Sequence, residues 1–245
     1  MVPADAGPTP VQVYERADQV WHEQVLPPYI AFVSHVEDEP DRVRVLIRTR
    51  DGAAYTETIP QPPNRKVTAV VDAHLTGPYG APLGFCVSAV YCSGVLENDP
   101  FGPAVPAVNG PNVIAHVYAY ADAYAIAFGS ITRYHDHDVF ELRLEPRFDP
   151  KRYELRDMLV DAGDYRIWQM TYRVPHPGYD DATIRYDFGP VGSVWYLRHI
   201  CDWNSFLGDC GPKSTDLSEF AFYASAPAWL FNTKLWEAHK AEADR

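Results

Sequence analysis

The sequence predicts a mainly β fold with some α (α+β): a curved antiparallel sheet of about ten or eleven strands that forms a half-barrel covered by helices. Three observations predict it. Apolar and polar residues alternate in many short segments, which is the period of a half-buried strand. Turn-forming residues separate most of these segments, as in an antiparallel meander. A sheet of this many strands curls instead of staying flat, because neighbouring strands are twisted relative to one another.

The first predicted element is an amphipathic helix at Val11–Val25. Its apolar residues recur at three- and four-residue spacing, so they form one stripe along the helix. Thr9 has the position and the side chain of an N-cap, and Pro10 fits the first turn, where its missing N–H costs no hydrogen bond. Pro27 and Pro28 prevent the helix from continuing. An amphipathic helix packs its stripe against something larger, here the sheet.

The strands follow the helix, and most of them show the two-residue alternation. In chain order the predicted strands are Tyr29–Val36, Arg42–Arg50, Ala53–Ile59, Arg65–Val71, Val139–Glu145, Leu155–Val160, Tyr165–Val174, Ala182–Phe188, Ser193–Ile200 and Glu219–Ala224. Asp51 and Gly52 form a strong hairpin signal between the second and the third strand. The run Val113–Phe128 alternates small residues with mostly aromatic ones. Because this period outranks the helix preference of alanine, the run predicts two further strands.

The chain is expected to form one domain, at residues 11–236. Residues 1–10 are predicted to be a flexible segment, and residues 237–245 a polar tail. Within the domain, residues 74–112 are rich in glycine and proline, and a connection of this length is usually functional or partly ordered. We interpret this segment as an insertion over one end or face of the sheet, and we expect a short closing helix to begin at Ala226.

The charge balance excludes several classes of partner. Lys and Arg number 21 against 33 Asp and Glu, which gives a formal net charge of −12. Such a balance would not neutralise nucleic-acid phosphates, so no nucleic-acid partner is expected. Electrostatic docking on anionic lipid headgroups is excluded for the same reason. The sequence has no run of about 18 apolar residues, so no transmembrane segment is predicted.

The four cysteines, Cys86, Cys92, Cys201 and Cys210, bear on the compartment. Their spacings fit zinc knuckles poorly. Pairing of Cys86 with Cys92 and of Cys201 with Cys210 is favoured because each pair brackets a short loop-like stretch, and four buried free thiols are the alternative. Disulfides and the Pro/Ala/Gly-rich start favour a periplasmic or otherwise exported protein, although residues 1–10 contain neither the basic nor the apolar part of a signal peptide.

Two aromatic rows are the strongest candidates for a ligand surface: Tyr118, Tyr120, Tyr124 and Phe128, and Trp168, Met170 and Tyr172. On strands, each row is expected to share one face of the sheet. Aromatic side chains with a polar tip suit a ligand surface, and concave apolar cavities with few polar groups are the usual small-molecule sites. The same rows also suit an ordinary core beneath the helices. The sequence predicts no metal and no cofactor.

Histidines beside acidic residues or cysteine are the candidates for catalysis. The run His-Asp-His-Asp at 135–138 lies between two predicted strands, so a hairpin turn is favoured over a metal site or an acid–base site. His116 is interpreted as a packed residue. His199 and Cys201 suggest a Cys/His nucleophile, but no supporting motif accompanies them. No catalytic residue is therefore assigned, and the sequence favours a protein that is not an enzyme.

In its topology this pattern resembles the LolA/LolB-like lipoprotein-carrier fold. That fold has an N-terminal helix, a long antiparallel sheet curved into an unclosed half-barrel, and helices across the concave mouth. The resemblance runs through the helix Val11–Val25, the strand pair Tyr29–Val36 and Arg42–Arg50, and the strand pair Val139–Glu145 and Leu155–Asp161.

The resemblance implies an exported bacterial carrier or sensor of the outer-membrane lipoprotein-sorting kind, which binds a lipid, an acyl chain or another hydrophobic small molecule in the concave face. Burial of each CH2 would contribute about 0.8 kcal/mol, and release would follow movement of the covering helix or of residues 74–112. Two alternatives stay open. One is an enzyme, with or without a metal, that uses His116, His135, His137 or His199 in the same cavity. The other is a structural or interaction protein whose sheet edge pairs with an envelope protein partner.

Overall fold

The computed structural model describes residues 7–37, 42–49, 54–59, 69–72, 123–148, 155–174, 182–204, 209–211 and 214–231, together with Leu235 and His239. Several predicted features lie outside the described residues: the segment 74–112, Cys86 and Cys92, the run 113–122 with His116, Tyr118 and Tyr120, and nearly all of the tail 237–245.

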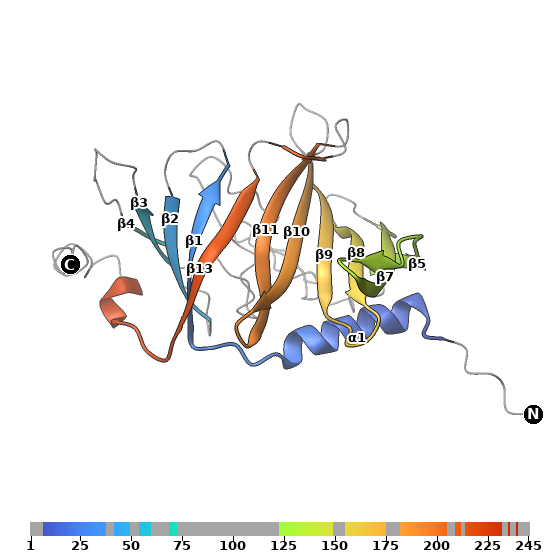
Figure 1. The fold of residues 1–245 in the computed structure, drawn as a ribbon, viewed down its shortest axis with the longest axis horizontal. Helices are drawn as coiled ribbons and strands as arrows, with labels where there is room; N and C mark the ends of the chain where they lie inside the picture. Colours follow the sequence, from blue (N-terminus) through green and yellow to red (C-terminus); the bar gives the residue numbers. More distant parts are fainter. Residues whose placement is uncertain are drawn as a thin grey trace, which may run out of the picture.

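The described strands belong to one antiparallel sheet. In chain order they are β1 (Tyr29–Val36), β2 (Arg42–Arg48), β3 (Ala54–Ile59), β4 (Ala69–Asp72), β5 (Tyr124–Phe128), β6 (Arg133–Tyr134), β7 (His137–Pro146), β8 (Leu155–Asp161), β9 (Ile167–Val174), β10 (Ala182–Val191), β11 (Val194–Asn204), β12 (Asp209–Cys210) and β13 (Thr215–Tyr223). Their spatial order is β4-β3-β2-β1-β13-β11-β10-β9-β8-β7-β5, while β6 pairs with β7 and β12 pairs with β11 (Figure 1).

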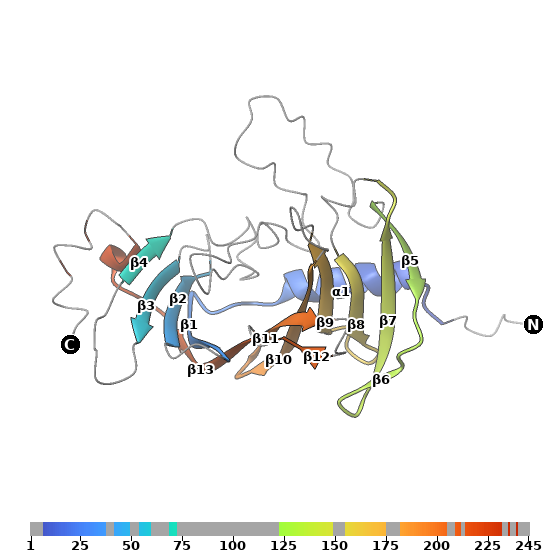
Figure 2. The same cartoon turned by 90° about the horizontal axis from the view of Figure 1, so that it is seen from above.

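The sheet is curved and open. Within the described residues, β4 and β5 lie at its two ends and do not pair with each other, so the strands do not close on themselves. Figure 2 shows the strands bent into a trough, with the helix α1 (Pro10–Glu23) on its inner side. This confirms the predicted curved half-barrel. We call the side of the sheet on which α1 packs the inner face, and the opposite side the outer face.

Helix α1 begins where the sequence predicts. Thr9 Oγ1 accepts a hydrogen bond from the Gln12 amide at 3.3 Å, and Gln12 Oε1 accepts one from the Thr9 amide at 2.8 Å, which together form a capping box. Pro10 occupies the first turn. The helix ends at Glu23, earlier than the predicted Val25, because Gln24 already has an extended backbone. The apolar stripe then packs onto the inner face of the sheet.

Strand alternation sorts side chains onto the two faces. The inner-face core includes Ile30, Phe32, Val45, Ile47, Leu142, Met158, Met170 and Tyr186, all at most 3% exposed. Val13, Tyr14 and Ala17 of α1 belong to the same cluster. On the outer face of β9, Gln169 and Thr171 alternate with the buried Met170. The described part of the inner face is therefore a packed core.

The first and the last of the described strands pair in the middle of the sheet. Strand β1 pairs antiparallel with β13, so that Tyr29 lies opposite Tyr223. The register shifts between Ala31 and Val33, and Glu219 on the partner strand has a positive φ of 52°. Beyond β13, a short 3-10 helix at Ala228–Phe231 lies where the closing helix is predicted to begin, and Leu235 has a helical backbone. None of the described helices is both long and apolar enough to span a bilayer.

Candidate ligand-binding site

An open hollow of about 430 Å3 lies beneath the second half of α1, and we call it the α1 hollow. Its apolar lining consists of Ala17, Val20, Trp21, Val25, Ile167 and Trp195, and its polar lining of Glu23, Gln24, Arg166 and Ser193. These residues come from α1 and the residues after it, from the start of β9, and from the β10–β11 hairpin. The volume is typical of small-molecule sites, and the lining combines six apolar residues with four polar or charged ones.

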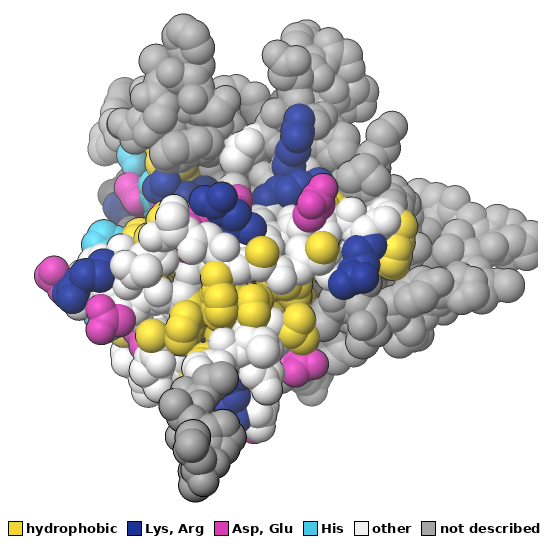
Figure 3. All heavy atoms as spheres, turned by 90° about the vertical axis from the view of Figure 1, so that its right-hand side faces the viewer, with side chains coloured by type: hydrophobic (Ala, Val, Ile, Leu, Met, Phe, Trp, Pro, Cys, Tyr) yellow, Lys and Arg dark blue, Asp and Glu magenta, His cyan; other side chains and the backbone are white. Residues whose placement is uncertain are grey.

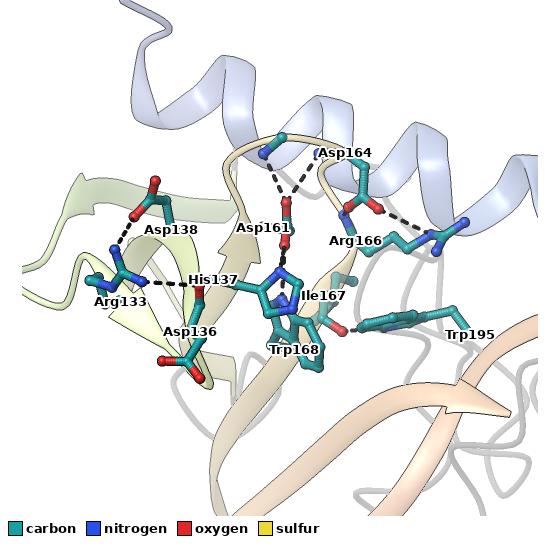
Figure 4. A network of polar contacts seen from close by, with 11 residues as sticks. Arg133, Asp136, His137, Asp138, Asp161, Asp164, Arg166, Ile167, Trp168 and Trp195 are labelled. Atoms are coloured by element: carbon teal, nitrogen blue, oxygen red, sulfur yellow. Dashed lines mark hydrogen bonds and ion pairs between the residues drawn. The ribbon is translucent and has the colours of Figure 1, made fainter.

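The turn between β8 and β9 holds one wall of the α1 hollow in place. Asp161 Oδ1 accepts hydrogen bonds from the amides of Gly163 at 2.8 Å and Asp164 at 3.2 Å, which is the side-chain pattern that stabilises a tight turn. Asp161 Oδ2 accepts a third hydrogen bond, at 3.1 Å, from the indole N–H of Trp168. Because this turn leads directly into β9, it fixes the position of Arg166 at the hollow (Figure 4).

The same contacts determine the charge of Asp161. His137 Nδ1 lies 3.1 Å from Asp161 Oδ2. Burial raises the pKa of Asp161, but the hydrogen bonds from Trp168 and from the amides of Gly163 and Asp164, with His137 nearby, outweigh it and hold that pKa below its ordinary value. Asp161 is therefore a charged acceptor at neutral pH, which strengthens the hydrogen bonds that shape the turn.

Trp195 joins the three walls of the hollow. Its backbone N–H donates to Gln24 Oε1, directly after α1. Its indole N–H donates to the carbonyl oxygen of Ile167 at 2.6 Å, and the Arg166 guanidinium lies over its ring at 5.3 Å from the centroid. The ring also meets that of Trp168 edge to face, with centroids 4.5 Å apart. Figure 4 shows Trp195 beside Ile167 and below Arg166.

The two halves of α1 are held to different extents. Val13 and Ala17 are fully buried in the core, whereas Val20 and Trp21 are only partly buried and line the hollow. Trp21 touches Phe188 edge to face at 5.4 Å. Val25, one residue beyond the helix cap, is 88% exposed. The first half of the helix therefore anchors it, and the second half covers the hollow.

The predicted ligand residues are divided among several places. Tyr124, Met170 and Tyr172 are buried in the core, where the Tyr172 hydroxyl donates to Met170 Sδ at 3.3 Å. Figure 3 looks onto the end of the molecule at which β5 lies and shows hydrophobic side chains gathered there. Phe128 in β5 is 43% exposed and packs on Phe140 with ring centroids 5.7 Å apart. Ligand contact by these residues stays a prediction.

Trp168 lies on the other face from Met170, so the prediction that they share one face is wrong. The pairing of β8 with β9 shifts by one residue, since Leu159 lies opposite Gln169 and Val160 lies opposite Ile167. Trp168 is the extra residue of this bulge, and a bulge re-aims side chains. Trp168 and Gln169 both line a hollow of about 550 Å3 on the outer face, which we call the outer hollow.

The run 135–138 forms the predicted hairpin turn. Tyr134 of β6 lies opposite His137 of β7, and the two residues between them have positive φ angles, 46° for His135 and 66° for Asp136. These are the angles of a tight two-residue hairpin turn. Arg133 donates to the Asp136 carbonyl oxygen at 3.1 Å and closes the turn. Neither histidine belongs to a potential metal cluster among the described residues.

Cys201 and Cys210 form a disulfide, as the sequence predicts. His199 lies beside it, with Nε2 3.8 Å from Cys210 Sγ. The sequence suggested a free Cys201 nucleophile next to His199, and the disulfide excludes that role in this oxidised state.

Among known proteins, similarity to this chain is found in solved structures. No family model matches it, and no curated protein matches it. It is similar to a LolA superfamily protein from Nitrosomonas europaea (14% identity, TM-score 0.41, covering 93% of this chain and 99% of that one).

Two further structures are similar to this chain. One is a DUF1329 family protein from Desulfovibrio piger, with 9% identity, a TM-score of 0.44, and coverage of 93% and 99% of the two chains. The other is an outer membrane lipoprotein-sorting protein domain from Vibrio parahaemolyticus, with 13% identity, a TM-score of 0.42, and coverage of 92% and 97%. At these identities the likeness concerns the fold and not the ligand.

Proposed function

We propose that this protein is an exported carrier or sensor that holds an acyl chain or another hydrophobic ligand between α1 and the inner face of the sheet. The observation that carries the proposal is the α1 hollow: an open space lined by six apolar and four polar residues and covered by the half of the helix that is least buried. A ligand that enters there reaches Val20, Trp21 and Trp195 without breaking the core around Met170.

The lining supports a ligand with an apolar body and a polar end. Six of the lining residues are apolar, while Arg166, Glu23, Gln24 and Ser193 supply the polar contacts. Arg166 Nε pairs with Asp164 at 3.5 Å, and the side chain is half exposed, so its terminal N–H groups could donate to a carboxylate or phosphate head. Each buried CH2 of the chain would contribute about 0.8 kcal/mol, less the cost of ordering the ligand.

The contacts of the second half of α1 suggest how a ligand is admitted and released. Lifting this half separates Trp21 from Phe188 and Gln24 from Trp195, while Val13 and Ala17 stay in the core. The cost includes one ring contact and one hydrogen bond, about 1–3 kcal/mol together, and the exposure of the apolar surface by which Trp21 packs on the core. The disulfide between Cys201 and Cys210 favours an oxidising, extracytoplasmic compartment.

The test is titration of the purified protein with a fluorescent fatty acid, with the Val20→Glu variant beside it. A charge at Val20 lies in the hollow and should weaken binding at least about tenfold, because burial of an unpaired carboxylate is costly. Val11→Glu is the matched control: the same substitution in the same helix, at a residue that is 40% exposed and does not line the hollow.

Native mass spectrometry of the protein, purified without added lipid, should also show a bound hydrophobic molecule in the wild type and less of it in Val20→Glu. Equal fatty-acid affinity of Val20→Glu and Val11→Glu, or no measurable binding by the wild type, would refute the proposal.

A further inference from the structure

On the outer face, away from the α1 hollow, four strands bring a disulfide together with charged groups. The sheet register places Cys201 opposite Arg185, Trp203 opposite Cys210, and His199 opposite Asp216. The disulfide therefore links β11 to β12 at the point where β10 and β13 flank them. We call Arg185, His199, Cys201, Cys210 and Asp216 the disulfide cluster.

The polar contacts of this cluster converge on one of the two sulfurs. Arg185 donates to Cys210 Sγ at 3.4 Å, and His199 Nε2 lies 3.8 Å from the same atom. His199 Nδ1 is in turn 2.8 Å from Asp216 Oδ1, which orients the imidazole toward the sulfur. Cys210 is partly exposed, whereas Cys201 is fully buried. The two sulfurs thus differ in both exposure and surroundings.

This asymmetry is the arrangement that thiol–disulfide exchange requires. A cation and an imidazole beside a sulfur favour its thiolate form, and a stabilised thiolate is both an accessible nucleophile and a good leaving group. A buried partner thiol can close the disulfide again but is shielded from solvent. A disulfide that only staples two strands needs neither an Asp–His pair nor a guanidinium on one of its sulfurs.

A metal site is the competing interpretation, because His199, Cys201 and Cys210 offer ligand atoms within 4.8 Å of one another. Two observations oppose it. The sulfurs are bonded to each other, and the Arg185 guanidinium already lies 3.4 Å from Cys210 Sγ. A divalent cation beside that guanidinium would be repelled.

We propose that the Cys201–Cys210 disulfide is exchange-active and oxidises a dithiol substrate. A substrate thiolate attacks Cys210 Sγ, so a mixed disulfide forms and Cys201 leaves as a thiolate that takes up a proton. The second substrate thiolate then attacks the substrate sulfur of the mixed disulfide, and Cys210 leaves as a thiolate beside Arg185 and His199. In total the dithiol loses two electrons and two protons, and the protein disulfide becomes a dithiol.

Cys210 is partly exposed, so a substrate would contact it directly, beside hollows that its neighbours His199 and Arg185 line. His199 lines both the outer hollow and a second hollow of about 550 Å3 beside it. Besides His199, the charged and titratable groups that line these two hollows are His35 and Arg42, Tyr134 and His135, Arg185 and Asp187, Arg198, and Asp216. Asp187 pairs with Arg185 at 3.2 Å and keeps its guanidinium in position. A thiol substrate therefore approaches over a polar surface.

The test uses the full chain with Cys86→Ser and Cys92→Ser, so that only the pair in the cluster remains. Adding Cys201→Ser frees Cys210, and the rate of its alkylation by iodoacetamide is measured from pH 5 to 9. We expect alkylation at neutral pH about tenfold faster than that of glutathione, with the rise in rate shifted to lower pH. Arg185→Met and His199→Ala should each move the rise back toward the pH of an ordinary thiol.

The matched control is Cys210→Ser, which leaves the buried Cys201 and should react at least about tenfold more slowly. In the variant that retains both Cys201 and Cys210, dithiothreitol should reduce the disulfide of the folded protein at pH 7. The circular dichroism spectrum should stay unchanged. A disulfide that is reduced only after unfolding would overturn the proposal. So would a Cys210 thiol with an ordinary pH profile, or stoichiometric zinc uptake by the reduced protein.

Discussion

Met170 and Gln169 are neighbours in β9, yet they lie in opposite kinds of surroundings. Met170 is fully buried on the inner face, between Met158 of β8 and Tyr186 of β10. Gln169 points to the outer face, where its amide donates to Asp187 at 2.8 Å beside the open outer hollow. Two consecutive side chains of one strand thus lie in a buried apolar core and on a polar surface, respectively.

The difference indicates where each property of the protein resides. The middle of the described inner face is filled by its own side chains, so stability resides there. A ligand finds space only where this packing ends, beneath the second half of α1. The outer face carries ion pairs, histidines and the disulfide cluster, together with the ring contacts of Trp168.

The largest expected loss of stability comes from truncating Met170, the buried residue of the two. Met170→Ala should lower the free energy of unfolding by about 2–5 kcal/mol, because it leaves a cavity in a packed core. Gln169→Ala, on the same strand, should cost only about 1 kcal/mol, the value of one hydrogen bond at a half-buried site. Urea unfolding measures both. Equal losses would remove the distinction between the two faces.

Asp161 should matter next, because it stabilises the bulge that turns Trp168 outward. Asp161→Ala removes an acceptor for the Trp168 indole and for the amides of Gly163 and Asp164, and should cost about 2–3 kcal/mol. Asp164→Ala removes an exposed acceptor for the Arg166 amide and an exposed ion pair with its guanidinium, and should cost about 1 kcal/mol at most. A similar loss in the two variants would show that the acceptor role of Asp161 is unimportant.

The hydrogen bonds that Asp161 accepts should also make the stability of the protein depend on pH. The pKa of Asp161 is lowered in the folded protein. The pKa of Glu141 is also lowered, since the amides of Ile131 and Ser130 and the neighbouring Arg143 outweigh the opposing effect of burial. A folded pKa below the unfolded one gives stability that is complete above the unfolded pKa and is lost as the pH falls through the folded pKa.

The free energy of unfolding should therefore decline as the pH falls below about 4.5, near the ordinary carboxylate pKa values. Urea titrations at successive pH values check this. In the Asp161→Asn, Glu141→Gln double variant the decline should be shallower, because two of the groups that cause it are gone. Asp157 acts in the opposite direction, since burial, followed by the charge of Glu141, raises its pKa. An unchanged slope in the double variant would contradict the assignment.

The smallest effect is expected at a buried hydroxyl of the inner face. Tyr196 is fully buried and, within the described residues, its hydroxyl has no hydrogen-bond partner. Tyr196→Phe removes a desolvated polar atom and should change the free energy of unfolding by less than about 1 kcal/mol, toward greater stability. Tyr172→Phe breaks a hydrogen bond to Met170 Sδ and should destabilise slightly. A lower melting temperature for Tyr196→Phe than for Tyr172→Phe would contradict these assignments.

Local signals in the sequence predicted much of the fold. The capping box at Thr9 and Gln12, the two-residue alternation of the strands and the turn at 135–138 each depend on residues close together in the chain. Pairing of Cys201 with Cys210 also follows from a short separation. Such features need no knowledge of the tertiary structure.

The parts that the sequence did not reveal depend on distant residues. Periodicity alone cannot show that β1 pairs with β13, and a bulge at Trp168 breaks the alternation on which its face was predicted. Asp216 reaches His199 only through the neighbouring strand. The α1 hollow depends on where three separate elements fail to fill the space between them.

The most direct test of the central claim is photolabelling with a diazirine-bearing fatty acid, followed by peptide mass spectrometry of the labelled chain. We expect labels that are competed by unlabelled fatty acid and that lie at residues 17–25, 166–167 and 193–195, which include the lining of the α1 hollow. Labels concentrated on the outer face around Arg185 and His199, or labelling that excess fatty acid does not displace, would contradict a ligand in this hollow.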